Sequence, residues 1–195
     1  MTPQTNTEQR QLQRFTYTDY LTWDDDIRQE LIDGVSYLMA APSSTHQEIL
    51  GELFNQLKNF LKGKTCRVYM SPFDVRLNPN TGDDTVVQPD ILVVCDSSKI
   101  DKRGLVGAPD MIIEILSPSS TKMDKLLKFR KYCQAGVREY WILDPKNEYV
   151  QVHLLVGDKY VNTAYSSEDT AIPVTILEGC YINLADVFNS LLYKE

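Results

Sequence analysis

Residues that build structural zinc sites are scarce in this sequence. Its 195 residues include only two histidines, and its four cysteines lie far apart with no Cys-x-x-Cys pair. A structural zinc site is therefore not expected. The cysteines stand in apolar or helical surroundings, and we interpret them as reduced, buried thiols of a cytoplasmic protein: Cys66, Cys95, Cys133 and Cys180.

Long apolar segments are also missing. No stretch approaches the roughly 18 to 20 apolar residues that a membrane-spanning helix needs. The first eight residues, Met1 to Glu8, are polar and lack the basic and then apolar order of a secretory signal. We therefore expect a cytoplasmic protein with no membrane partner.

Positive charge is in deficit over the whole chain. The formal net charge is −7 and the isoelectric point is near 4.9, so the average surface should repel nucleic acid. The charge is unevenly distributed, because residues 122–139 carry six Lys or Arg residues against two acids. Total charge argues against a nucleic-acid partner, whereas this basic segment is compatible with one.

Length and composition indicate one globular domain. Hydrophobic residues make up 43% of the chain and charged residues 24%, which is ordinary for a soluble protein. Such a length is sufficient for a single buried core. Residues 1–14 are rich in Gln and Thr, so we expect a disordered or extended tail there and a single domain over 15–195.

The hydrophobic pattern predicts an α/β fold. Asp33-Gly34 is a strong hairpin signal between strands at 28–32 and 35–39. Ser44 and Gln47 have the spacing of a capping box for a helix that ends at Gly63. The remaining elements expected are a short helix at 16–26, strands at 66–71, 73–77, 86–95, 110–116 and 139–143, a helix at 122–135, a hairpin of 148–154 with 159–165, and a helix at 185–193.

Two isolated acids interrupt apolar strands. Asp90 lies in the run 86–94 and Glu114 in the run 111–116. A charge in such a strand is costly unless it is paired, and a bound cation is one such partner. Asp90 would alternatively satisfy a backbone donor at a strand start. Lysines follow in the next amphipathic segment, and acids that hold a divalent ion beside ammonium groups suit phosphodiester cleavage.

These motifs together resemble one protein family. The matching segments are Glu30-Leu31-Ile32-Asp33-Gly34, Ala41-Pro42-Ser43 with His46, Pro89-Asp90, Glu114 to Ser119, the helical residues Asp124, Lys128 and Tyr132, and Gly136 to Trp141. Over about residues 15 to 190 the chain looks like the Uma-type restriction endonuclease family of the PD-(D/E)XK nuclease-like superfamily. The resemblance implies a restriction-endonuclease-like core, which is a central mixed β-sheet flanked by helices, with extra β-hairpins near both ends.

The resemblance also implies a set of site residues. Asp90, Glu114 and Glu30 would hold Mg²⁺ or Mn²⁺. The superfamily places a lysine two residues after the second acid, but Leu116 stands there. The resemblance implies that Lys128 supplies the missing cation, with Lys125 and Lys131 as rivals. His46, in the first turn of a helix, we interpret as structural.

The predicted function is metal-dependent hydrolysis of nucleic acid by an endonuclease, with DNA favoured over RNA. The catalytic residues would be Asp90, Glu114, Lys128 and Glu30. The alternative is a catalytically inactive nuclease-like module that binds nucleic acid or protein, which the acidic isoelectric point and the missing lysine favour. Palindromic double-strand cleavage would call for a homodimer, but no sequence feature identifies its interface.

Overall fold

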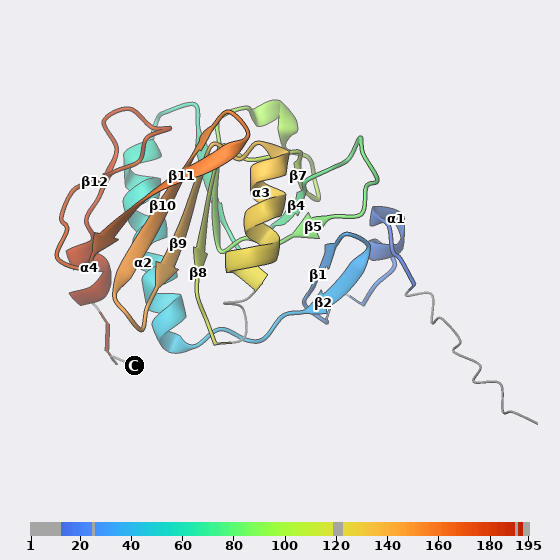
Figure 1. The fold of residues 1–195 in the computed structure, drawn as a ribbon, viewed down its shortest axis with the longest axis horizontal. Helices are drawn as coiled ribbons and strands as arrows, with labels where there is room; N and C mark the ends of the chain where they lie inside the picture. The colour runs from blue at the N-terminus through green and yellow to red at the C-terminus, as the bar shows by residue number, and fades with distance from the viewer. Residues whose placement is uncertain (1–12, 25, 119–122, 190, 193–195) are drawn as a thin grey trace, which may run out of the picture.

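The fold is mixed α/β with two mixed sheets and few helices (Figure 1). The computed structural model describes residues 13–24, 26–118, 123–189 and 191–192. Most of the tail expected over residues 1–14 therefore lies outside the described residues. Within the described part of the chain, no helix is both long and apolar enough to cross a membrane.

The larger sheet has six strands. Only β8 and β9 in it run parallel; every other neighbouring pair is antiparallel. Its order is β11 (Lys159–Ser166), β10 (Tyr149–Val156), β9 (Glu139–Asp144), β8 (Met111–Ile115), β6 (Ile91–Val94) and β3 (Arg67–Met70). The predicted hairpin near the C-terminus is confirmed as β10–β11, and it extends this sheet.

The second sheet has five shorter strands. Its order is β2 (Val35–Leu38), β1 (Gln29–Ile32), β5 (Val86–Val87), β4 (Asp74–Arg76) and β7 (Gly104–Val106). The predicted N-terminal hairpin is confirmed as β1–β2. Asp33 and Gly34 both have positive φ, at 52° and 73°, as expected for a tight turn of type I′.

The predicted central mixed sheet is the larger of two mixed sheets, and Pro89 gives the physical reason for the division. The run expected as one strand over 86–95 is divided, since β5 pairs with β1 in the smaller sheet and β6 pairs with β8 in the larger one. Proline lacks the N–H that a central strand must donate, so the chain leaves one sheet at Gln88 and enters the other at Ile91. Asp90 therefore lies at the junction of the two sheets.

Helices cover both faces of the larger sheet. Figure 1 shows α2 (Ser44–Leu61) on one face and α3 (Phe129–Ala135) on the other. The π-helical turn η2 (Met123–Lys128) leads directly into α3, so the helix expected over 122–135 is not a regular α-helix throughout. The smaller elements are α1 (Tyr17–Tyr20), η1 (Ser97–Lys99), β12 (Ile172–Pro173), β13 (Tyr181–Ile182) and α4 (Leu184–Asn189).

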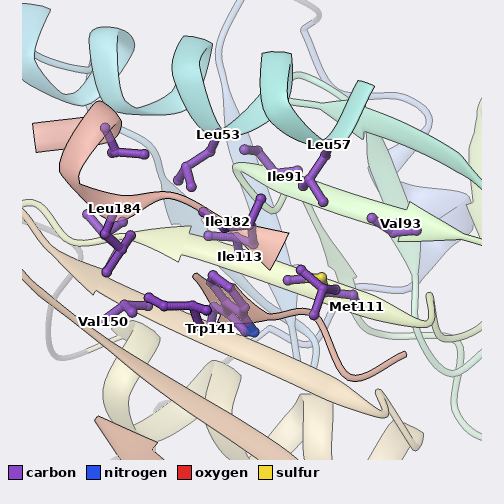
Figure 2. Close-up of a cluster of buried hydrophobic side chains, with 14 of the residues drawn as sticks. Leu53, Leu57, Ile91, Val93, Met111, Ile113, Trp141, Val150, Ile182 and Leu184 are labelled. Atoms are coloured by element: carbon purple, nitrogen blue, oxygen red, sulfur yellow. The ribbon is translucent and has the colours of Figure 1, made fainter. Parts of the chain in front are cut away.

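The helix α2 packs through one apolar stripe. Ile49, Leu53 and Leu57 are fully buried against Ile113 and other residues of the larger sheet (Figure 2). Burial of each such side chain is worth about 1.5–3 kcal/mol. The N-cap is Ser43, whose Oγ accepts from the backbone N of His46, rather than the predicted Ser44.

A second apolar cluster occupies the opposite face of the larger sheet. It joins Leu92, Ile112 and Ile142 of that sheet to Tyr132 of α3 and to Ile32 of the smaller sheet. Even-numbered residues of β8 point to this face, which gives Glu114 the same orientation as Ile112. This second cluster therefore positions the acidic residue of β8 next to α3.

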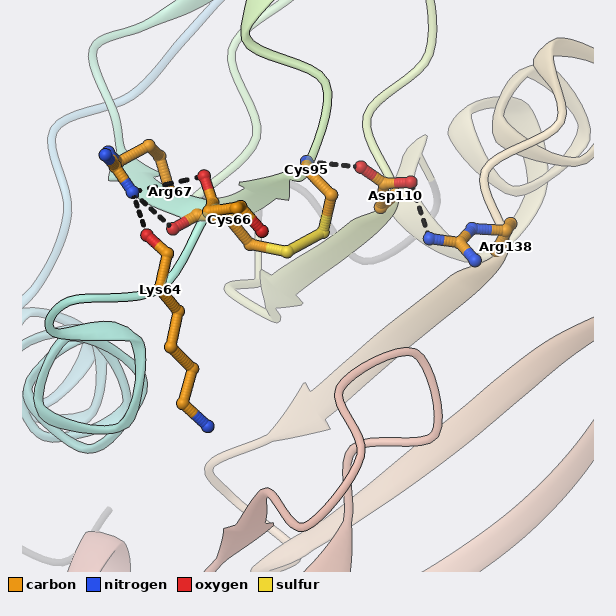
Figure 3. The surroundings of a disulfide bond; sticks show 7 residues. Lys64, Cys66, Arg67, Cys95, Asp110 and Arg138 are labelled. Carbon is orange, nitrogen blue, oxygen red and sulfur yellow. Dashed lines mark hydrogen bonds and ion pairs between the residues drawn. A yellow bond between two sulfur atoms is a disulfide. The ribbon is translucent and has the colours of Figure 1, made fainter.

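The expectation of four reduced cysteines is wrong for two of them. Cys66 and Cys95 form a disulfide at the junction of β3 and β6, and Figure 3 shows it beside Asp110. Asp110 accepts a hydrogen bond of 2.6 Å from the backbone N of Cys95 and one of 2.6 Å from Arg138. The two cysteines are 29 residues apart, and only the antiparallel pairing of Arg67 with Val94 brings them together.

Candidate functional site

Two predicted site acids meet at the junction of the sheets. Ile91 pairs with Ile113, so the antiparallel register places Asp90 opposite Glu114. The backbone N of Ile115 donates a hydrogen bond of 2.7 Å to Asp90 Oδ2, and the N of Asp90 lies 3.5 Å from Glu114 Oε2. Adjacent strand ends thus hold the two carboxylates side by side.

Lys128 binds the acids from the helical side. Its Nζ lies 2.9 Å from Glu30 Oε1 and 3.1 Å from Glu114 Oε1. The lysine is only 4% exposed, and the two glutamates are 4% and 3% exposed. A buried charge is tolerated when it is paired and hydrogen-bonded, so these three residues form one interdependent ionic group.

Tyr132 completes this group one helical turn further along. Its hydroxyl donates a hydrogen bond of 2.7 Å to Glu114 Oε1. Burial of the ring, together with the negative charge of Glu114, raises the pKa of Tyr132 well above its usual range. Tyr132 therefore remains a neutral donor that fixes the orientation of the Glu114 carboxylate.

The two rival lysines point elsewhere. Lys125 Nζ lies 4.0 Å from Asp144 Oδ2, and Lys131 forms an ion pair with Asp33. Neither lysine lines the cavity beside Asp90 and Glu114. Of the three candidates, Lys128 is the one that the structure brings to the acids. The side chain of Asp124, expected on the same helical face, lies outside the described residues.

His46 contacts the site although the sequence suggested a structural role. Its Nε2 lies 3.2 Å from Asp90 Oδ2, and the residue is 8% exposed. In the described part of the chain its Nδ1 is buried without a hydrogen-bond partner. The Ser43 cap that begins α2 places this imidazole beside Asp90, which no local sequence signal indicated.

A cavity of about 170 Å³ lies beside these side chains. Its wall includes all four predicted site residues together with His46, and two residues that sequence analysis missed, Arg28 and Gln88. The backbone N of Gln88 donates a hydrogen bond of 2.7 Å to Glu30 Oε1. Each missed residue lies two positions before a predicted acid: Arg28 directly precedes β1, and Gln88 directly follows β5.

The donor set suits a hard divalent cation bound through few protein ligands. Asp90 and Glu114 supply carboxylate oxygens, and Mg²⁺ commonly binds through one or two carboxylates while keeping several waters. Among the described residues, no group of three or more His, Cys, Asp or Glu side chains is arranged to hold a metal ion. Glu30 directs Oε1 to Lys128 and Gln88 instead.

Comparison with known proteins identifies the family and the fold of this chain. The family model Uma2, described as "Putative restriction endonuclease", matches residues 17–185. The crystal structure of a "putative nuclease belonging to DUF820" from Anabaena variabilis superposes with a TM-score of 0.74 at 20% identity, covering 90% of this chain and 98% of that one. This structural likeness shows a shared fold.

A curated relative is more similar in sequence. The uncharacterized protein slr1290 of Synechocystis sp. is 30% identical over 127 residues, which are 64% of this chain and 65% of the relative, just under two thirds of its length. The family match spans most of the chain and includes Glu30, Asp90, Glu114 and Lys128. The chain therefore belongs to the Uma2 family, whose description is "Putative restriction endonuclease" and which is also known as DUF820.

Proposed function

We propose that this protein is a divalent-metal-dependent nuclease that hydrolyses phosphodiester bonds of nucleic acid, with DNA rather than RNA as its substrate. The observation that carries the proposal is the meeting of Asp90 and Glu114 beside a cavity, with the Lys128 ammonium 3.1 Å from Glu114. Family membership supports the reaction class, and the restriction-endonuclease-like core that we propose belongs to a single domain over 15–195.

The proposed roles follow from the contacts. Asp90 and Glu114 would hold the ion, which would supply Lewis-acid polarisation of the phosphodiester and help to activate water as the nucleophile. His46 and the N–H of Ile115 fix the Asp90 carboxylate by binding Oδ2. Tyr132 fixes Glu114 in the same way. Hydrogen-bonded neighbours of this kind orient metal ligands.

Lys128 has the charge that the reaction needs. Negative charge grows on the phosphate oxygens during displacement, and a fixed ammonium group stabilises it in a site that excludes bulk water. Glu30 Oε1 lies 2.9 Å from Lys128 Nζ. We therefore assign Glu30 to positioning Lys128, a refinement of the expectation that Glu30 is a third metal ligand.

Two measurements on the purified protein test this function. Calorimetric titration with Mn²⁺ should show binding that Asp90→Asn and Glu114→Gln abolish. Incubation of supercoiled plasmid with Mg²⁺ or Mn²⁺ should give nicked or linear DNA, and EDTA should prevent this. Wild-type protein that takes up no Mn²⁺ and cuts neither DNA nor RNA would instead be a nuclease-like binding module.

A further inference from the structure

A second pocket adjoins the acidic cavity. It has a volume of about 280 Å³, and Arg28 and Gln88 line both it and the cavity that contains Asp90 and Glu114. Its remaining wall comes from α1 and the segment that leads from α1 into β1, from residues near β4 and from Arg103 before β7. The volume is near the lower limit of roughly 300 Å³ for small-molecule sites, so it suits a group the size of one nucleobase.

Aromatic side chains form one wall of this pocket. The rings of Tyr20 and Trp23 lie 5.2 Å apart, and Phe15 packs edge-on against Trp23 at 5.3 Å. Leu21 and Ile27, which also line the pocket, are 41% and 50% exposed. Partly exposed aromatic rings on a fixed support are the surfaces on which unpaired bases stack.

Arg28 supplies a charge that no carboxylate of the described residues pairs with. Among the described residues it has no carboxylate within ion-pair distance, whereas Arg76 pairs with Asp83 and Arg138 with Asp110. Its one hydrogen bond runs from Nη2 to the neutral Gln88 Oε1 at 3.3 Å, and its Nε is buried without a partner in the described structure. A guanidinium group that has no carboxylate partner among the described residues is suited to bind a phosphate group.

Gln88 lines both cavities and binds Asp74, one of the two described acids that line the second cavity. Its side-chain amide donates to Asp74 Oδ1 at 2.9 Å, and Asp74 Oδ1 also accepts from the Tyr20 hydroxyl at 3.0 Å. The Asp74 carboxylate is therefore engaged by two donors of the chain itself. The pocket thus presents the Arg28 guanidinium and aromatic rings, together with the exposed side chains of Asp24 and Arg103. Gln88, which lines both cavities, lies two positions before Asp90 in the chain.

We infer that this pocket is a subsite for an unpaired nucleotide next to the phosphate that is cut. The base stacks on Trp23 and Tyr20, while Arg28, between the two cavities, binds the connecting phosphate. A base that enters such a pocket cannot remain in a duplex, so the favoured substrate has a single-stranded, terminal or extruded nucleotide at this position. The inference rests on the proposed nuclease function and names its substrate class.

Tryptophan fluorescence reports on this subsite without cleavage. The chain has two tryptophans, of which Trp141 is fully buried in the core and Trp23 lines the pocket. A six-nucleotide oligothymidine added to the wild-type protein in EDTA should quench the emission of Trp23. Competition against a labelled oligonucleotide then gives the affinities of variants that lack this fluorophore.

The variants should separate the subsite from its surroundings. Trp23→Ala and Arg28→Gln should each weaken oligothymidine binding about tenfold to a hundredfold, the range for loss of one stacking contact. Trp23→Phe, which keeps a ring, should retain most of the affinity. Tyr181→Ala and Arg138→Gln, an exposed aromatic and an ion-paired arginine outside the pocket, are the matched controls and should bind like wild type.

Two results would overturn the inference. One is equal binding by Trp23→Ala, Arg28→Gln and wild type, with thermal melting showing that all three are folded. The other is equally tight binding of a blunt duplex of the same length. Mn²⁺ titration of the same samples reports separately on Asp90 and Glu114, so loss of the metal site and loss of the nucleotide subsite give different results.

Discussion

The Lys128 ammonium group lies 3.1 Å from the Glu114 carboxylate, although the two residues are 14 positions apart and on different elements. The position two residues after Glu114 belongs to Leu116, which is buried in the apolar cluster beneath α3. The Lys128 ammonium group thus reaches Glu114 of β8 from the start of α3. Glu30, from the other sheet, holds it in that position.

Lys128 should be needed for turnover far more than for metal binding. We expect Lys128→Arg to lower the rate of cleavage on the order of 10²-fold. The larger guanidinium group of arginine cannot occupy the position of the ammonium group, and loss of one transition-state donor costs about 10²–10³-fold in rate. Mn²⁺ affinity, measured by calorimetry, should change little, because lysine is not a ligand. Lys125→Ala, whose side chain is 35% exposed, is the control and should cut normally.

Removing the charge of Lys128 should also lower the free energy of unfolding. Lys128→Ala leaves Glu30 and Glu114 buried without their counter-ion, which costs about 3–5 kcal/mol of unfolding free energy. Adding Glu30→Gln should recover part of that loss, because one uncompensated charge is removed. Urea unfolding of both variants measures this, and equal stability of Lys128→Ala and wild type would contradict the buried ionic group.

Glu30 and Asp90 should differ in their effect on the metal. Asp90→Asn should abolish detectable Mn²⁺ binding. Glu30→Gln should lower Mn²⁺ affinity by no more than the roughly 10- to 100-fold typical of a residue outside the ligand shell, while still reducing turnover through Lys128. If Glu30→Gln abolishes Mn²⁺ binding in calorimetry as completely as Asp90→Asn, Glu30 is a ligand.

Stability should fall as the pH drops from neutrality, and His153 is one cause. Burial lowers the pKa of His153 to about 4, whereas an unfolded histidine titrates near 6.5. Between these values the unfolded chain binds the extra proton, so unfolding becomes easier as pH falls from about 6.5 to 4, by up to about 3 kcal/mol. In urea unfolding experiments, His153→Gln should reduce the change in unfolding free energy between pH 6.5 and 4. His46→Gln is the control and should leave the contribution of His153 unchanged.

Because of the disulfide, the number of reactive thiols in the denatured protein should depend on reductant. Without reductant, two thiols of the denatured protein should react, those of Cys133 and Cys180; with reductant, all four should. A bond closing a loop of 29 residues contributes roughly 3–4 kcal/mol by the chain-entropy argument. Cys66→Ser should lower unfolding free energy accordingly, and four reactive thiols without reductant would show that the bond is absent.

Much of the local structure was predictable because its signals are local. The leucine stripe of α2, the Asp33-Gly34 turn and the alternation of β10 each depend on residues that are near one another in the chain. Trp141, which lies in the strand predicted at 139–143, is fully buried in the core. Strand β7 was missed, because it is short and its partner β4 comes from a distant part of the sequence.

The assembly of the site was less predictable, since its contacts are long-range. The sequence indicated Asp90, Glu114 and Lys128 as candidates, but not that Glu30 and Glu114 would share the ammonium of Lys128. The contact of His46 with Asp90 joins residues 44 positions apart, and no local pattern encodes it. The division of one apolar run between two sheets does have a local signal in Pro89, because proline cannot donate a hydrogen bond within a central strand.

The order in which the site residues are synthesised has a consequence. Glu30, Asp90 and Glu114 leave the ribosome before Lys128 does, and domains fold as units during synthesis. Until the segment with Lys128 and Tyr132 emerges, the acids lack the cation and the hydroxyl that hold two of them in the folded protein. A growing chain therefore lacks the complete ionic group of Glu30, Glu114 and Lys128 until the segment with Lys128 has emerged and packed against the junction of the two sheets.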